Sequence, residues 1–120
     1  YKILHINERT KMKKVKIGTA GVDSGQLMVS DPCYVKDFIS NEVDFENKKD
    51  DKSYSYSGAC HQTLQNENQG GELGNGLGVV FSTGIGDGSY PVYAYLGEID
   101  GFGERVLKVE IDFNDHVLLD

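Results

Sequence analysis

The most constraining feature of the sequence is a period-two pattern near its C-terminal end. Four apolar residues alternate with charged residues there: Leu107, Val109, Ile111 and Phe113. This alternation is typical of a β-strand with one buried face and one wet face. An earlier strand is predicted over 89–96, and Asp100-Gly101 between the two is a pair favoured in turns that need positive φ. We therefore expect an antiparallel pair of strands here.

The first third of the chain predicts shorter elements. Apolar runs over 15–19 and 26–30 indicate two strands, joined by a turn-rich, hairpin-like connection. Asp31 followed by Pro32 is typical of a helix N-cap with proline in the first turn, so a short helix is expected to follow, as far as residue 39.

The middle of the chain is richer in polar residues and glycine. Residues 40–53 hold eight charged residues and are expected to form an exposed loop. Residues 54–56 are interpreted as a strand tip, and 59–65 as a short helix. From residue 69 to 88 eight glycines flank one apolar run, Val79-Val80-Phe81, which predicts a buried strand between turns.

Together these elements define the expected fold class and domain. The fold is predicted to be mainly β, either all-β or α+β with one or two short helices, as an antiparallel β-sandwich or open barrel. A last short strand is expected over 116–119. A chain of 120 residues fits one β-rich domain over 15–120, preceded by a basic extension over 1–14. Because Met12 followed by lysines resembles a protein start, residues 1–11 are interpreted as a translated leader; a first strand over 2–6 is the alternative.

Charge is distributed unevenly along the chain. Residues 1–16 hold six basic residues and one acidic residue, whereas the remainder holds six basic and eighteen acidic residues. An acidic body repels phosphate backbones, so nucleic acid is not an expected partner unless the basic arm binds it alone. No signal peptide and no run of about 20 apolar residues is present, so we expect a cytoplasmic protein, bacterial or in an infected host, that does not bind a membrane.

Several short segments resemble a known family. They are Val22-Asp23-Ser24-Gly25, Asp31-Pro32, the run from Phe81 to Tyr93 (FSTGIGDGSYPVY), and the closing Ile111-Asp112-Phe113. With them the chain resembles DUF4241, a bacterial and phage family of unknown function whose recurring motifs are V-D-S-G and F-S-S-G-x-G-D-G-x-Y-P-x-Y. Thr83 replaces the usual second serine, and Ile85 stands where an aromatic residue is common. The resemblance implies a shared fold and a shared site, and it implies no reaction.

The glycine–aspartate loop around Asp87 is the first candidate site. Phosphate-binding glycine loops lead into a helix, whereas this one leads into a strand, so nucleotide binding is not expected. Asp87 either caps its own turn or contacts a ligand. Asp23 and Asp31 also lie beside turns, and three such carboxylates could hold Mg²⁺ or Ca²⁺ or act as acid and base, although turn capping is commoner.

Cysteine and tyrosine supply the remaining candidates. Cys33, Cys60 and His61 lack the paired spacing of a structural zinc site, so the cysteines are expected to be free thiols. Tyr93 and Tyr95 share one face of a predicted strand with Pro91, and such a strip, if exposed, suits a partner protein or a flat ligand.

The function predicted from these observations is binding without catalysis. We expect a small module of phage, plasmid or bacterial origin that captures a host protein or a small ligand. No catalytic residue, metal ligand or cofactor is assigned. The candidate ligand-binding residues are Asp23, Ser24, Asp31, Asp87, Ser89, Tyr90 and Tyr93. The alternative is a small carboxylate-dependent hydrolase or transferase, with or without a metal, that uses the loop aspartates.

Overall fold

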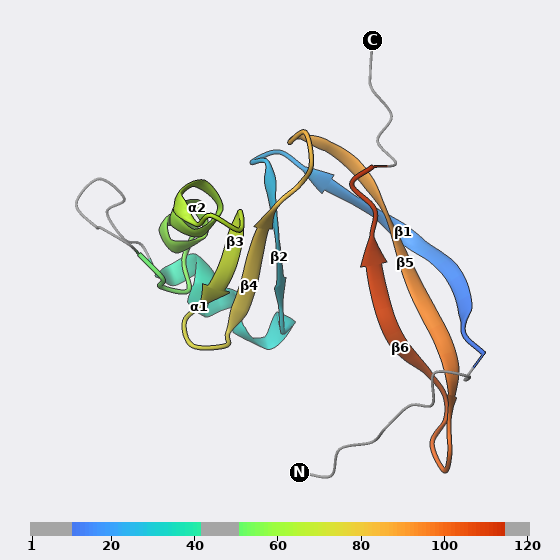
Figure 1. Cartoon of the computed structure of the whole chain (residues 1–120). Coiled ribbons are helices and arrows are strands. Elements are labelled where there is room, and N and C mark those ends of the chain that lie inside the picture. The colour runs from blue at the N-terminus through green and yellow to red at the C-terminus, as the bar shows by residue number, and fades with distance from the viewer. Residues whose placement is uncertain (1–10, 42–50, 115–120) are drawn as a thin grey trace. The chain divides into compact units, whose positions relative to one another are not determined.

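The computed structural model describes residues 11–41 and 51–114, which form two compact units. Unit 1 contains residues up to Gly21 and from Gly88 onward, and unit 2 contains Val22–Asp87. Each unit has its own three-stranded sheet (Figure 1). The predicted fold class, mainly β with short helices and antiparallel strands, is confirmed. The expected strand over 116–119, and the leader except for Lys11, lie outside the described residues.

Unit 1 is a sheet of long strands in the order β1-β5-β6. β1 spans Lys13–Val22, β5 spans Gly88–Ile99 and β6 spans Gly103–Ile111. The predicted turn joins β5 to β6, and its glycines Gly101 and Gly103 have φ of 84° and 81°, a conformation that side chains with a Cβ rarely adopt.

A β-bulge interrupts the pairing of β5 with β6. Tyr95 pairs with Lys108 and Leu96 pairs with Val106, so Leu107 is the extra residue on β6. The predicted alternation of β6 is therefore present only on the C-terminal side of the bulge. Its apolar face is also less buried than the pattern indicates, since Val109 is 54% exposed.

Unit 2 contains the sheet β2-β4-β3, with β2 over Gln26–Ser30, β3 over Gly70–Leu73 and β4 over Gly78–Ser82. β2 runs antiparallel to β4 from Gln26 opposite Ser82 to Ser30 opposite Gly78. The predicted hairpin-like connection between 15–19 and 26–30 is wrong, because β1 and β2 belong to different sheets. In β4 only one face is buried: Val80 is 1% exposed and Val79 is 48% exposed.

Helices cover unit 2 and begin where capping residues allow. Asp31 accepts a hydrogen bond from the Cys33 N–H at 3.0 Å and begins the 3₁₀ turn η1 over Pro32–Tyr34, which continues as α1 over Val35–Ser40. The helix α2 spans Tyr56–Gln65, and its N-cap Ser55 accepts from the Gly58 N–H at 3.0 Å. The predicted strand tip over 54–56 is therefore wrong.

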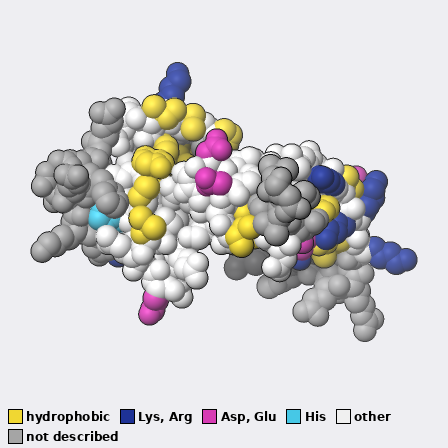
Figure 2. Space-filling model, turned by 90° about the horizontal axis from the view of Figure 1, so that it is seen from above, with side chains coloured by type: hydrophobic (Ala, Val, Ile, Leu, Met, Phe, Trp, Pro, Cys, Tyr) yellow, Lys and Arg dark blue, Asp and Glu magenta, His cyan; other side chains and the backbone are white. Residues whose placement is uncertain are grey.

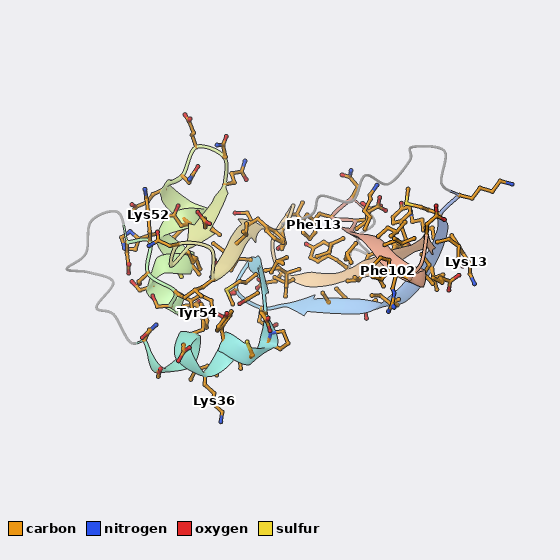
Figure 3. All side chains as sticks on the ribbon, turned by 90° about the horizontal axis from the view of Figure 1, so that it is seen from below. Lys13, Lys36, Lys52, Tyr54, Phe102 and Phe113 are labelled. Carbon is orange, nitrogen blue, oxygen red and sulfur yellow. The ribbon has the colours of Figure 1, made fainter. Side chains whose placement is uncertain are left out.

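The core of unit 2 is small and centred on Tyr54. Tyr54, Ala59, Leu73 and Val80 are buried together, with Met28, Phe38 and Leu77 packed against them. The Tyr54 ring, which is labelled in Figure 3, meets Phe38 of α1 edge to face, with the ring centroids 5.1 Å apart. Its hydroxyl lies 2.6 Å from the Ser30 Oγ, so the polar tip of this buried ring is satisfied.

The loop before α2 is only partly as expected. Residues 42–50 of the predicted exposed loop lie outside the described residues, but Asp51 is buried, at 4% exposure. Its carboxylate accepts from the Ser53 N–H at 2.9 Å and the Ser57 hydroxyl at 2.8 Å. A Cβ at Gly58 would meet the Ser53 carbonyl, so this glycine allows the loop to fold onto α2.

Candidate functional site

Unit 2 has an open pocket of about 190 Å³ between α1, α2 and the sheet. Its lining comes from the loop before β2, from β2, α1, α2 and β4: Ser24, Gln26, Leu27, Met28, Phe38, Tyr56, Ala59 and Val80. Most of these side chains are apolar, and the polar ones belong to Ser24, Gln26 and Tyr56. The pocket thus has an apolar lining with a few polar groups, which is the usual make-up of a binding site.

One face of α2 is turned toward β2 beside the pocket. Tyr56, Cys60 and Thr63 stand at positions i, i+4 and i+7 and share this face. The Gln26 amide of β2 donates to the Cys60 Sγ at 3.6 Å and accepts from the Thr63 hydroxyl at 2.9 Å. These contacts fix the orientation of the amide and hold α2 against β2.

Tyr56 combines exposure with a hydrogen bond to the helix. Its side chain is 59% exposed at the pocket. The hydrogen bond with the Cys60 thiol raises the pKa of the Tyr56 hydroxyl above its ordinary value, while a hydrogen bond with Ser24 acts in the opposite direction. The phenol is therefore neutral at physiological pH and can both donate and accept a hydrogen bond.

Of the sequence-predicted residues, Ser24 lies in the pocket and the three aspartates stand at exposed loops. The Asp87 carboxylate accepts the Gly25 N–H at 2.9 Å, a contact 62 residues along the chain. Asp31 caps η1, and the Cys33 N–H that it accepts lowers the pKa of the Asp31 carboxyl. Within the described residues no three His, Cys, Asp or Glu side chains gather in a way that could hold a metal ion.

The other predicted residues lie on β5 in unit 1. Ser89 is exposed. Tyr90 is fully buried, and its ring packs edge to face against Phe113 at 5.1 Å, so it belongs to the core of that unit. Tyr93 is partly exposed, and the Lys14 ammonium lies 4.3 Å from the centre of its ring.

The cysteines and the histidine do not converge. Cys33 is an exposed free thiol, and Cys60 is a partly buried one that contacts Gln26. His61 is buried, with its Nδ1 3.3 Å from the Gln65 Oε1. Consecutive helical residues point about 100° apart, so Cys60 and His61 use different faces of α2.

Sequence reasoning missed Gln26, Phe38 and Tyr56 as site residues. Tyr56 was missed because the predicted helix began three residues too late, at 59, which hid the helical spacing of Tyr56, Cys60 and Thr63. Ser55 three residues before Gly58 was the available signal, since serine is a preferred N-cap. The contribution of Phe38 depends on how α1 packs, and local sequence does not specify that.

The fold and pocket describe a small, mainly β protein with an apolar pocket in one of its two units. Comparison with protein families finds a match over residues 5–101 to DUF4241, described as a protein of unknown function. The match covers most of the chain, and the protein belongs to this family. Comparisons with curated proteins and with solved structures gave no significant match.

Proposed function

We propose that this protein is a binding module that holds one apolar side chain of a partner protein in the pocket of unit 2. The size of the pocket is the observation that carries the proposal. Pockets for drug-sized molecules enclose about 300–1,000 Å³, whereas this one encloses about 190 Å³. A cavity of about 150 Å³ holds a single benzene ring, so the pocket suits one large side chain. A host protein is therefore favoured over a small ligand.

The surroundings of the pocket support a protein partner. Binding energy in protein interfaces is concentrated in a few anchors that fill pockets, with less important contacts around them. Here Tyr56 stands exposed at the pocket, and α1 exposes Val35 (46%) and Ile39 (71%) next to the pocket residue Phe38. Figure 2 shows hydrophobic side chains gathered on one face of unit 2.

The alternative function, a carboxylate-dependent hydrolase or transferase, needs its aspartates to act together. Two of them have backbone partners at separate loops, Asp31 at η1 and Asp87 at Gly25. No observation on the described residues favours this reaction over binding. The proposal therefore rests on the pocket, which Ser24 and Tyr56 help to line. Asp87 supports the loop that precedes β2.

A series of pentapeptides tests the proposal. Acetyl-Gly-Gly-X-Gly-Gly-amide, with X as Ala, Leu, Met, Phe or Tyr, is titrated into ¹⁵N-labelled protein. We expect weak binding, with a Kd of roughly 6–80 mM, only for the large X residues, because a single buried side chain contributes about 1.5–3 kcal/mol. The perturbed amide signals should be those of residues 24–28, 38, 56–60 and 80.

Matched tyrosine variants locate the binding. Tyr56→Ala should abolish the shifts, and Tyr34→Ala, at an exposed tyrosine that does not line the pocket, should leave them unchanged. Shifts that do not depend on X, or that persist in Tyr56→Ala, would show that the pocket does not bind side chains.

A further inference from the structure

The sheet of unit 1 carries two tyrosines among basic side chains on one face. We call this surface the tyrosine face; its residues include Lys14, Lys16, Tyr93, Tyr95, Lys108 and Glu110. Tyr93 lies opposite Glu110, and Tyr95 lies opposite Lys108. Lys14 reaches the same face, because its ammonium lies over the Tyr93 ring, and Lys16 follows it by the alternation of a strand.

The bulge in β6 affects which face of the sheet each charged side chain of this strand occupies. Lys108 pairs with Tyr95 on the tyrosine face, whereas Glu104, beyond the bulge, pairs with Glu98, which alternates onto the other face. Arg105, which pairs with Gly97, and Asp112, which follows Glu110 by the alternation of the strand, also belong to the tyrosine face, so four cations accompany two anions there. Figure 2 shows Lys and Arg side chains gathered on this part of the molecule. Over the described residues unit 1 has six basic and five acidic residues, and unit 2 has two basic and seven acidic residues.

Glu110, the anion of this face that contacts Tyr95, is already neutralised. Glu110 accepts a hydrogen bond from the Tyr95 hydroxyl at 3.0 Å and forms a salt bridge with Lys14 at 3.0 Å. Lys108 lies over the Tyr95 ring at 4.5 Å. Lys14 and Lys108 thus stand on the ring faces, and the exposed side chains of Lys16, Arg105 and Lys108 can be reached by an incoming anion.

The spacing of the Tyr93 and Tyr95 rings suits bases that are not stacked on each other. Residues i and i+2 of a strand are about 6.7 Å apart, roughly twice the 3.4 Å rise per nucleotide of helical DNA. Two bases drawn out of a helical stack could each take one ring. A base on an aromatic ring contributes about five- to a hundredfold in affinity, and an exposed lysine over a ring about two- to fivefold. A base therefore displaces the lysine, whose ammonium can then pair with phosphate.

We propose that the tyrosine face binds single-stranded nucleic acid, with bases stacked on Tyr93 and Tyr95 and phosphates paired with Lys16, Arg105 and Lys108. An acidic peptide would use the lysines and leave the ring pair without a role. The net charge of −7 opposes binding weakly, since charges are screened beyond about 8 Å at physiological ionic strength. The basic N-terminal part of the sequence contributes Lys14 and Lys16 to this face, because both residues belong to β1.

Fluorescence anisotropy with fluorescein-labelled (dT)₁₅ tests this surface on the full chain. We expect micromolar affinity in 50 mM salt and a logarithmic salt slope of about −2, as three cations on a single strand give. Tyr95→Leu should weaken binding about tenfold or more, and Tyr95→Phe, which keeps the ring, should bind as the wild type does. Lys108→Gln should make the slope shallower by about 0.7.

Tyr34→Leu and Lys36→Gln are the controls, since both replace exposed residues of unit 2 and should change nothing. Each variant is first compared with the wild type by ¹⁵N correlation spectra. If Tyr95→Leu binds (dT)₁₅ as tightly as Tyr95→Phe, the rings do not stack on bases and the face is only a polyanion surface. An absence of binding in 50 mM salt would overturn the proposal entirely.

Discussion

Gly25 shows how single residues fix the loop that leads into the pocket. Its φ is +69°, and both of its backbone groups are bound by the loop after β4. The Thr83 N–H donates to the Gly25 carbonyl at 3.1 Å, and the Asp87 carboxylate accepts the Gly25 N–H at 2.9 Å. The backbone next to the pocket residue Ser24 is therefore held by a residue far along the chain.

Substitutions at Asp87 separate a hydrogen-bonding role from a charge role. Asp87→Asn should change the free energy of unfolding by less than about 0.5 kcal/mol, because the amide oxygen can still accept the Gly25 N–H. Asp87→Ala should cost about 1 kcal/mol, the usual value of one such bond. Urea denaturation measures both. A loss of several kcal/mol in both variants would mean that the carboxylate belongs to a charge network that holds the fold.

For single residues, the sequence predicted helix capping better than it predicted contacts between residues far apart in the chain. The Asp31 cap followed from the residue pair Asp31-Pro32. Asp87 was expected either to cap its own turn or to contact a ligand, and its hydrogen bond with Gly25 could not be foreseen, because local patterns carry no information on loops 62 residues apart. Asp51 was assigned to an exposed loop on charge alone, and it is buried because Ser53 and Ser57 satisfy its carboxylate.

The hairpin of β5 and β6 shows which features of an element can be predicted from its own residues and which depend on pairing. Its turn and both strands were predictable from the period-two pattern and Asp100-Gly101, whereas the bulge at Leu107 was not. A bulge depends on pairing between strands, and alternation within one strand does not reveal it. For the same reason strands β1 and β2 were predicted, but the sheets that they join were not. Each of them pairs with a strand that is distant in the sequence.

The bulge also leaves two like charges directly opposite each other, Glu98 and Glu104. Opposed like charges destabilise a sheet, and opposite charges contribute about 0.2–1 kcal/mol. Glu104→Lys should therefore raise the free energy of unfolding by about 0.5–1 kcal/mol in 50 mM salt, and by less in 1 M salt because the pair is exposed. Urea denaturation at the two salt concentrations is the measurement.

Two controls distinguish the pair from net charge. Glu67→Lys changes the charge of the chain equally at an exposed position of unit 2, and should not stabilise to the same degree. The double variant Glu98→Lys with Glu104→Lys restores two like charges and should lose the gain. An equal gain in the two single variants, with a larger gain in the double variant, would show that relief of net charge, rather than the cross-strand pair, is responsible.

For the whole molecule, the pattern of expected strands predicted the mainly β class, while the division into two units follows from strand pairing. Within the described part of the chain, no helix is long and apolar enough to cross a membrane. Unit 1 joins residues from both ends of the chain, and unit 2 is the continuous stretch between them. The candidate residues Ser24 and Asp87 belong to unit 2 and Tyr90 and Tyr93 to unit 1, which the linear sequence did not separate.

Unit 2 is one continuous stretch of the chain, and this leads to a prediction about its independent folding. Its three strands, its helices and the core around Tyr54 all lie within Val22–Asp87. A peptide of residues 22–87 should therefore fold alone, with dispersed ¹⁵N correlation signals and the pentapeptide binding described above. A domain of this size buries only about 60% of its surface, and its stability should not exceed about 3–5 kcal/mol. Collapsed signals from the peptide at 10 °C would show that unit 2 needs the rest of the chain to fold. Dispersed signals without pentapeptide binding would instead mean that the fold is independent and that the proposed use of the pocket is wrong.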